Sequence, residues 1–299
     1  MRVNPLVMMF EGIIPPLVTP FKNDGKLNEE GLRALVNFLT EKGISGFFIC
    51  GTYGTGPAMT TEERKRTAEV VVDSAKGKAK VIVHVGSSNI DTVLDLAKHA
   101  EDVGADAVAS VPPYYYAYDD ESILEFFKGL ISKVRIPVFV YNNPARSGNP
   151  IKPSLLSRLA DEGVAGIKDS CFDLVKFYEF LTTVHKKGFE FIIGTEALLV
   201  PAYLAGSRAC ISGLANVFPE INVKAFNLLR EGKYVEATKV QLDIIRLREV
   251  MHLFPTYPAI FEALRLRGID VGFARKPFRK LSREEVQRLE ENLKRIGML

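Results

Sequence analysis

The sequence predicts an α/β protein: a (β/α)8 TIM barrel over residues 1–218, followed by a C-terminal helical extension over residues 219–299. Three observations lead to this prediction. Short apolar runs rich in β-branched residues alternate with longer amphipathic segments. Several amphipathic segments end in glycine and continue directly into the next apolar run. After the eighth apolar run only helical patterns follow, which are more than an eighth βα unit needs.

Eight apolar runs are predicted as strands. Most are continuously apolar rather than alternating, which is typical of strands buried on both faces. In chain order they are Ile13–Val18, Gly46–Cys50, Val81–Val85, Ala107–Val111, Val138–Tyr141, Val164–Ile167, Phe191–Ile193 and Ala209–Ser212.

The segments between these runs are predicted as helices. Asn28–Glu41 has its apolar residues on one helical face. Thr60–Ala75 opens with a capping box, because a glutamate stands three positions after Thr60. A glycine that can end a helix in the left-handed conformation precedes four of the strands, at Gly43, Gly104, Gly163 and Gly206.

Two further patterns complete the fold prediction. A doubly wound sheet is the alternative, but it would require a glycine-rich loop after the first strand, where Pro15–Pro20 stands instead. The helices predicted for the C-terminal extension are Pro219–Arg230, Tyr234–Met251, Tyr257–Leu266 and Arg283–Ile296.

Composition restricts the possible partners. Of 299 residues 47% are hydrophobic and 25% charged, and the net charge of +3 gives no sign of a nucleic-acid partner. Cysteines are few and scattered, which suggests free thiols in a reducing compartment. The four histidines lack metal-ligand spacing, so we expect no metal.

No apolar run reaches the length of a membrane span. Residues 1–10 are too short for a signal peptide and suggest a frayed extension. We therefore expect a cytoplasmic protein without a membrane partner.

Lys168 is the strongest candidate for a catalytic residue. Active sites of such barrels lie at the C-terminal ends of the strands, and Lys168 follows the apolar run Val164–Ile167. Strand alternation places Val164, Gly166 and Lys168 on one face. If that face is the barrel interior, with Gly166 leaving room, burial lowers the lysine pKa and frees an amine to attack a carbonyl. Alternatively, Lys168 extends to the barrel rim or pairs with Asp169.

Hydroxyl groups follow other predicted strands. Tyr141 alternates with Phe139, so its phenol could share the interior and transfer protons, or it is simply a buried tyrosine. Thr52 alternates with Phe48 and Cys50 and could relay protons or hold a carboxylate, or it belongs to turn chemistry.

Two further features are weaker candidates. The aromatic cluster Tyr114–Tyr116 suits an exposed loop or an oligomer contact. Cys171 lies near Lys168, but no histidine stands close enough in the sequence to activate it as a nucleophile.

Taken together, these segments resemble the dihydrodipicolinate synthase and N-acetylneuraminate lyase superfamily (DapA-like lyases). The resemblance runs from Pro16 to Pro277. It rests on Gly51-Thr52-Tyr53-Gly54, Pro113-Tyr114-Tyr115, Tyr141-Asn142-Asn143-Pro144, Gly166-Ile167-Lys168-Asp169 and Gly194-Thr195-Glu196. It implies a homotetramer of two tight dimers that acts on a small 2-oxo acid and an aldehyde.

The resemblance also implies roles for individual residues. Lys168 matches the lysine that forms an imine with pyruvate, so no separate cofactor is expected. Tyr141 matches the general acid and base, and Thr52 matches the hydroxyl of the proton relay. Tyr115 matches a tyrosine that some members insert across the dimer interface. Ile211 and Ser212 match the strand end that lines the pyruvate pocket.

Three positions bear on the substrate. Tyr53 replaces a second hydroxyl residue that usually holds the pyruvate carboxylate, although the backbone amides of Thr52 and Tyr53 could still do so. Thr55 replaces a glutamate, and the form Gly54-Thr55-Gly56-Pro57 is similar to archaeal 2-keto-3-deoxygluconate aldolases. Arg146 matches an arginine of dihydrodipicolinate synthases that grips a second carboxylate, a bidentate contact suited to a guanidinium.

These features leave three functions open. The first is a class I, Schiff-base lyase that cleaves a 2-keto-3-deoxy sugar acid such as 2-keto-3-deoxygluconate. The second is a dihydrodipicolinate synthase that condenses pyruvate with aspartate semialdehyde. The third is a barrel that binds a keto acid without turnover.

Overall fold

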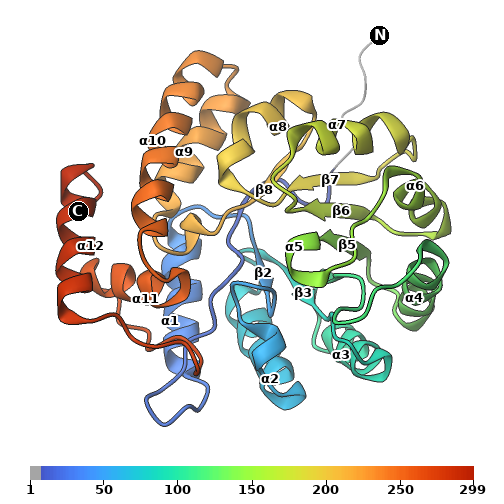
Figure 1. Cartoon of the computed structure of the whole chain (residues 1–299), viewed down its shortest axis with the longest axis horizontal. Coiled ribbons are helices and arrows are strands. Elements are labelled where there is room, and N and C mark those ends of the chain that lie inside the picture. The colour runs from blue at the N-terminus through green and yellow to red at the C-terminus, as the bar shows by residue number, and fades with distance from the viewer. Residues whose placement is uncertain (1–7) are drawn as a thin grey trace.

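The computed structural model describes residues 8–299 and confirms the (β/α)8 barrel, with eight parallel strands alternating with helices (Figure 1). The frayed extension expected at the N-terminus falls largely outside the described residues. The strands are β1 (Gly12–Ile14), β2 (Gly46–Ile49), β3 (Lys80–His84), β4 (Ala107–Ser110), β5 (Val138–Asn142), β6 (Gly166–Asp169), β7 (Glu190–Ile193) and β8 (Ala209–Ile211).

The helices surround these strands. Those of the barrel are α1 (Glu29–Glu41), α2 (Thr61–Ala75), α3 (Ile90–Asp102), α4 (Asp120–Lys133), the short α5 (Pro144–Ser147), α6 (Pro153–Glu162), α7 (Leu174–Thr183), α8 (Leu199–Ala205) and α9 (Pro219–Arg230). Three more follow: α10 (Tyr234–His252), α11 (Thr256–Leu266) and α12 (Arg283–Arg295). The capping box predicted at Thr60 is present, with both of its reciprocal hydrogen bonds.

The sheet order excludes the doubly wound alternative. The strands follow one another as β1-β8-β7-β6-β5-β4-β3-β2. Backbone hydrogen bonds join the two ends, from Ser45 N to Ile13 O at 2.9 Å and from Leu17 N to Phe48 O at 3.0 Å. The first strand is shorter than predicted because Pro15 and Pro16 have no N–H to donate.

Two strand boundaries near the site differ from the prediction. The strand expected at Val164–Ile167 runs from Gly166 to Asp169, because Val164 N still bonds back to Leu159 O at the end of α6. Lys168 therefore lies within β6 rather than after it. The second strand ends at Ile49, because Cys50 has a left-handed φ of 57°.

The barrel interior is filled below its C-terminal end. Side chains from alternate strand positions, together with Phe10 before β1 and Val111 after β4, form a separate core. Its strand members are Ile14, Phe48, Ile82, Ala107, Ala109, Phe139, Tyr141, Ile192, Ala209 and Ile211. Phe10 packs edge-on against Phe139, with ring centres 5.5 Å apart. At the opposite end of the barrel from the strand C-termini, buried Glu190 accepts hydrogen bonds from the backbone N–H groups of Met9 and Phe10.

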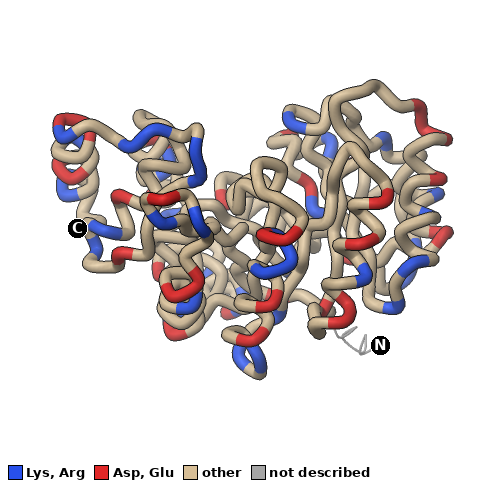
Figure 2. The backbone as a smooth tube through the Cα atoms, turned by 90° about the horizontal axis from the view of Figure 1, so that it is seen from below, with Lys and Arg blue, Asp and Glu red and all other residues tan. Residues whose placement is uncertain are grey.

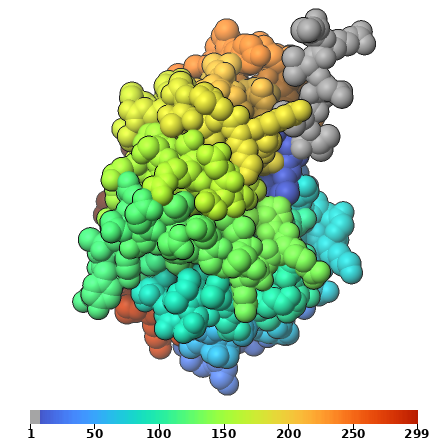
Figure 3. Space-filling model, turned by 90° about the vertical axis from the view of Figure 1, so that its right-hand side faces the viewer, coloured from blue at the N-terminus to red at the C-terminus, as the bar shows by residue number. Residues whose placement is uncertain are grey.

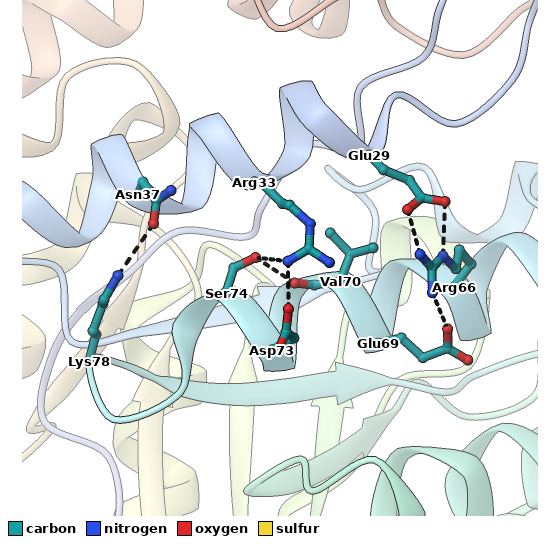
Figure 4. Close-up of polar contacts among 9 residues, drawn as sticks. All are labelled: Glu29, Arg33, Asn37, Arg66, Glu69, Val70, Asp73, Ser74 and Lys78. Carbon is teal, nitrogen blue, oxygen red and sulfur yellow. Dashed lines mark hydrogen bonds and ion pairs between the residues drawn. The ribbon is translucent and has the colours of Figure 1, made fainter.

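The helical ring follows the chain order. In the space-filling view, segments of successive colour lie side by side, as expected when neighbouring βα units are adjacent in sequence (Figure 3). Charged residues of both signs occur along the outer helices (Figure 2). On the solvent side of α1 and α2, Arg66 bridges Glu29 and Glu69, and Arg33 bonds Asp73 (Figure 4).

The C-terminal helices pack on one side of the barrel. α9 contacts β1 and α8, so it occupies the eighth place in the helical ring, and α10 lies beside it (Figure 1). The domain boundary predicted at Pro219 stays a prediction. No helix within residues 8–299 is long and apolar enough to cross a membrane.

Candidate active site

A cavity of about 480 Å³ opens at the C-terminal end of the strands. Strands β5, β6 and β8 and the segments that follow β1, β2, β5, β6, β7 and β8 supply most of its wall, and α10 and α11 supply the rest. The lining residues are Pro16, Thr52, Tyr53, Tyr141, Asn143, Ala145, Arg146, Lys168, Ser170, Phe172, Gly194, Thr195, Glu196, Ile211, Gly213, Arg248, His252, Thr256 and Tyr257.

Lys168 points into this cavity from β6 and is 3% exposed. Its Nζ lies 3.6 Å from the centre of the Phe48 ring and 3.8 Å from that of Tyr141. Burial lowers the pKa of the ammonium, and the neighbouring Tyr141 opposes part of that shift. Among residues 8–299 no carboxylate forms an ion pair with Lys168.

Asp169, the alternative partner considered for Lys168, belongs to another cluster. Its carboxylate accepts hydrogen bonds from Asn142 Nδ2 at 2.7 Å and from the Cys171 thiol at 3.0 Å. Burial and the adjacent Asp169 raise the pKa of that thiol to about 12, so Cys171 is poorly suited to act as a nucleophile.

Gly166 does not serve the purpose expected from the sequence. A Cβ at this position would lie 2.4 Å from Phe139 Cε1 and 2.4 Å from Glu190 O. The glycine thus makes room for the Phe139 ring, which fills the interior below Lys168.

Tyr141 lies beside Lys168 on the neighbouring strand, and the two residues are paired in the β5–β6 register. Its Oη is 3.2 Å from Thr52 Oγ1 and accepts a hydrogen bond from Asn143 Nδ2 at 2.8 Å. Burial acts to raise the pKa of the phenol. The Lys168 charge and the hydrogen bonds of Thr52 and Asn143 outweigh it, so the pKa is lowered overall.

Thr52 contacts Tyr141 from a turn after β2 and not, as predicted, by continuing the alternation of the strand. Alternation with Phe48 and Cys50 fails here, because the left-handed Cys50 turns the chain out of the strand. The Cys50 side chain faces the outer core towards Arg64 in α2, whereas Phe48 faces the interior. Thr52 lies in the turn that follows, and its hydroxyl faces the Tyr141 phenol.

The turn continues with Tyr53, whose ring fills space beside β8. A Cβ on Gly213 would lie 2.5 Å from Tyr53 Cζ and 2.6 Å from its Oη. The ring also packs edge-on against Tyr257, with centres 5.8 Å apart. Burial raises the pKa of the Tyr53 phenol, so the group is neutral.

The two residues expected to line the pocket from β8 separate. Ile211 lines the cavity, but Ser212 does not. The Ser212 side chain lies on the opposite side of the strand end, where its hydroxyl donates to Asn222 Oδ1 at 3.0 Å and accepts from Ala215 N. The Ser212 hydroxyl therefore points towards α9 and not into the cavity, because strand alternation turns it to that side.

Arg146 lies in the short helix α5, directly after β5, and is exposed at the cavity mouth. No carboxylate within residues 8–299 forms an ion pair with it.

Tyr115 lies away from the cavity: its side chain is 86% exposed, it has a left-handed φ of 86°, and its ring contacts Tyr116. Within one chain, Tyr115 is not among the residues lining the cavity.

Several residues at the site had no predicted role. Glu196, 2% exposed, pairs with Arg248 of α10 at 2.9 Å and accepts from Gly213 N at 3.0 Å. His252 and Tyr257 add to the same wall. Only Glu196, in a motif already noted, had a signal in the sequence. The others come from helices whose position over the barrel no local pattern reveals.

Buried His84 lies beneath the site. Its ring is edge-on to Tyr141 with centres 5.6 Å apart, and Nδ1 lies 3.1 Å from Cys50 O. Burial, together with nearby Arg64, holds the pKa of His84 well below its ordinary value, so the ring is neutral. Among the described residues no group of three or more histidine, cysteine or carboxylate side chains could hold a metal ion.

Comparison with known proteins adds a family to this geometry. Residues 9–296 match the dihydrodipicolinate synthetase family. A 4-hydroxy-tetrahydrodipicolinate synthase of Methanothrix thermoacetophila is 31% identical, over 97% of this chain and 98% of its own length. One from Methanocaldococcus jannaschii is also 31% identical, over 97% and 100%. A prophage protein of E. coli K12 from the dihydrodipicolinic acid synthase family, solved in complex with pyruvate, is 28% identical. It has a TM-score of 0.93 and covers 97% of this chain and 100% of its own.

Proposed function

Because the chain belongs to the dihydrodipicolinate synthetase family and is a class I, pyruvate-dependent carbon–carbon lyase, we propose that it forms its Schiff base at Lys168 and joins pyruvate to aspartate semialdehyde. The observation that carries the proposal is a buried lysine without a carboxylate partner, in contact with a hydrogen-bonded tyrosine. The family membership argues against the non-catalytic barrel considered above.

The first half-reaction uses the buried amine. With its pKa lowered by burial, Lys168 supplies a neutral Nζ that attacks C2 of pyruvate. The carbonyl oxygen takes up two protons, one from Nζ and one from a general acid, and leaves as water, so that a protonated imine (iminium) remains. We assign the role of this general acid, which donates and later recovers the proton, to Tyr141, with Thr52 as its hydrogen-bonded relay. No cofactor is required, because the iminium itself acts as the electron sink.

The second half-reaction forms the new bond. Loss of a C3 proton from the iminium gives an enamine, and its C3 attacks the aldehyde carbon while the aldehyde oxygen gains a proton. Hydrolysis or internal attack by the substrate's amine then frees Lys168. The amides of Thr52 and Tyr53 are our candidates for the pyruvate carboxylate, and Ile211 forms an apolar wall of its pocket.

Arg146 supports aspartate semialdehyde as the acceptor. The guanidinium stands at the cavity mouth without a carboxylate partner among residues 8–299, and such a fork suits the carboxylate of the acceptor. The second candidate is cleavage of a 2-keto-3-deoxy sugar acid. It is favoured by the turn around Thr55 and by the polar wall of Glu196, Arg248 and His252, which could bind hydroxyl groups.

One experiment tests the central step. The protein is incubated with pyruvate and borohydride, and the adduct is located by peptide mass mapping. We expect a reduced pyruvyl adduct on Lys168, none in Lys168→Ala, and an unchanged adduct in the surface control Lys152→Ala. An adduct on another lysine, or none, would contradict the proposal.

A second experiment distinguishes the two substrates. Pyruvate consumption with aspartate semialdehyde is compared with pyruvate release from 2-keto-3-deoxygluconate. We expect condensation to dominate and Arg146→Ala to raise KM for aspartate semialdehyde while pyruvate trapping is unchanged. Faster release from the sugar acid, with no effect of Arg146→Ala, would favour the second candidate.

A further inference from the structure

Asn143 occupies a helix-capping position but does not cap the helix. It is the residue before α5, where an asparagine side chain usually accepts a hydrogen bond from the first turn. Here no side-chain cap bond forms, and Asn143, 8% exposed, directs its amide into the cavity. Its Nδ2 donates instead to Tyr141 Oη at 2.8 Å.

The adjacent asparagine has a different environment. Asn142 faces away from the cavity, donates to Asp169 Oδ1 at 2.7 Å and accepts from Ile151 N at 3.1 Å. These bonds connect β5 to β6 and to the segment that leads into α6. Two neighbouring residues of one type thus have separate tasks, and only Asn143 contacts the phenol.

The hydrogen bond of Asn143 determines how Tyr141 can use its proton. When Oη accepts from Asn143, the phenol's own O–H is free to point to its other neighbour, Thr52 Oγ1 at 3.2 Å. An N–H donor also stabilises a phenolate more than a phenol, because charge-assisted hydrogen bonds are the stronger ones. The Asn143 amide therefore favours proton transfer from Tyr141 towards Thr52 and also stabilises the deprotonated phenolate of Tyr141.

We propose that Asn143 is a positioning residue for proton transfer, holding Tyr141 Oη so that its proton passes to and from Thr52. The inference rests on the proposed roles of Lys168 and Tyr141 and adds Asn143 to them. It acts through Tyr141, so removing it should alter the steps that move protons and leave Lys168 available to react.

The test compares Asn143→Leu with Asn143→Asp. We expect Asn143→Leu to lower kcat about 10- to 100-fold, as for a lost hydrogen bond to a charged group. The tyrosinate absorbance assigned to Tyr141 by difference against Tyr141→Phe should titrate at higher pH, because a donor to the phenolate is gone. Asn143→Asp should move it further in the same direction, because a carboxylate acceptor opposes the phenolate.

Two controls separate positioning from general damage. Ser147→Ala, in α5, removes a hydroxyl that donates to the backbone carbonyl of Asn143. This variant should leave the pH at which Tyr141 titrates unchanged. In a Tyr141→Phe background, Asn143→Leu should cost no further activity. A further loss there, or an unmoved titration in Asn143→Leu, would overturn the inference. Failure to trap pyruvate on Lys168 in the wild-type protein would instead overturn the proposed function.

Discussion

At the scale of single residues, burial controls the chemistry available to Lys168. The ammonium faces two aromatic rings and no carboxylate within residues 8–299, so its charged form loses hydration without gaining an ion pair. The neutral amine is therefore present at lower pH than for a lysine in water. The closeness of Tyr141 limits this effect, because it favours the charged ammonium.

The pH dependence of imine formation follows from these two contributions. The rate of pyruvate adduct formation, quenched with borohydride and quantified by intact mass, should rise with pH as Lys168 deprotonates. Its midpoint should lie below the value of about 10.4 for an ordinary lysine. In Tyr141→Phe the midpoint should move to still lower pH, because the group that raises the Lys168 pKa is altered. An upward shift in that variant would contradict the prediction.

The Tyr53 ring occupies the space beside Gly213, which gives a second prediction at the scale of residues. Gly213→Ala brings a methyl group to 2.5 Å from Tyr53 Cζ and should destabilise the fold by about 1–3 kcal/mol through overpacking. Tyr53→Thr should relieve it, giving a coupling of at least about 0.5 kcal/mol in urea unfolding of the double mutant. In Gly129→Ala, the control within α4, the new methyl meets no atom within 4 Å. Additivity between Tyr53 and Gly213 would show that the two do not compete for space.

At the scale of elements, α10 joins the extension to the active site through the ion pair of Arg248 with buried Glu196 and a hydrogen bond from Gln241 Nε2 to Glu196 O at 2.9 Å. Glu196 is almost fully enclosed, and Arg248 is its only cationic partner among the described ion pairs. Arg248→Ala leaves this carboxylate buried, so we expect a loss of roughly 3 kcal/mol in unfolding free energy. Arg246→Ala, which removes an exposed pair with Asp243 on the same helix, should cost less than about 1 kcal/mol. Equal losses in thermal or urea unfolding would contradict this difference.

Elements were the level at which the sequence was most informative. Continuous apolar runs and glycine-ended helices located all eight strands, because burial on both faces leaves a strong signal in composition. The predicted boundaries were wrong where a helix-end hydrogen bond or an unusual backbone angle sets the strand end: Val164 N bonds back to Leu159 O, and Cys50 has a left-handed φ. Lys168, Tyr141 and Thr52 meet in one cavity as expected. Asn143, Arg248 and His252 were missed, because their positions depend on hydrogen bonding and on helix packing over the barrel.

At the scale of the whole molecule, the exposed tyrosine loop suggests that a single chain lacks a contact that a second copy would supply. Tyr115 and Tyr116 are 86% and 65% exposed, and Tyr115 holds a left-handed backbone that a tyrosine rarely adopts. Such an exposed, strained aromatic loop is better explained by a contact with a second copy than by solvent. We therefore expect the homotetramer of two dimers that the resemblance implies, measurable by light scattering.

If Tyr115 completes the relay of a partner subunit, two inactive variants should restore one another. Lys168→Ala lacks the imine-forming amine but keeps Tyr115, and Tyr115→Ala has the reverse defect. Mixed after mild dissociation and reassembly, random pairing makes half of the dimers heterodimers, each with one intact site, so about a quarter of wild-type activity should return. Mixing Lys168→Ala with Tyr141→Ala should restore nothing, because these two side chains serve the same site from one chain. No recovery in the first mixture, with heterodimers confirmed by native mass spectrometry, would mean that Tyr115 does not act across the interface.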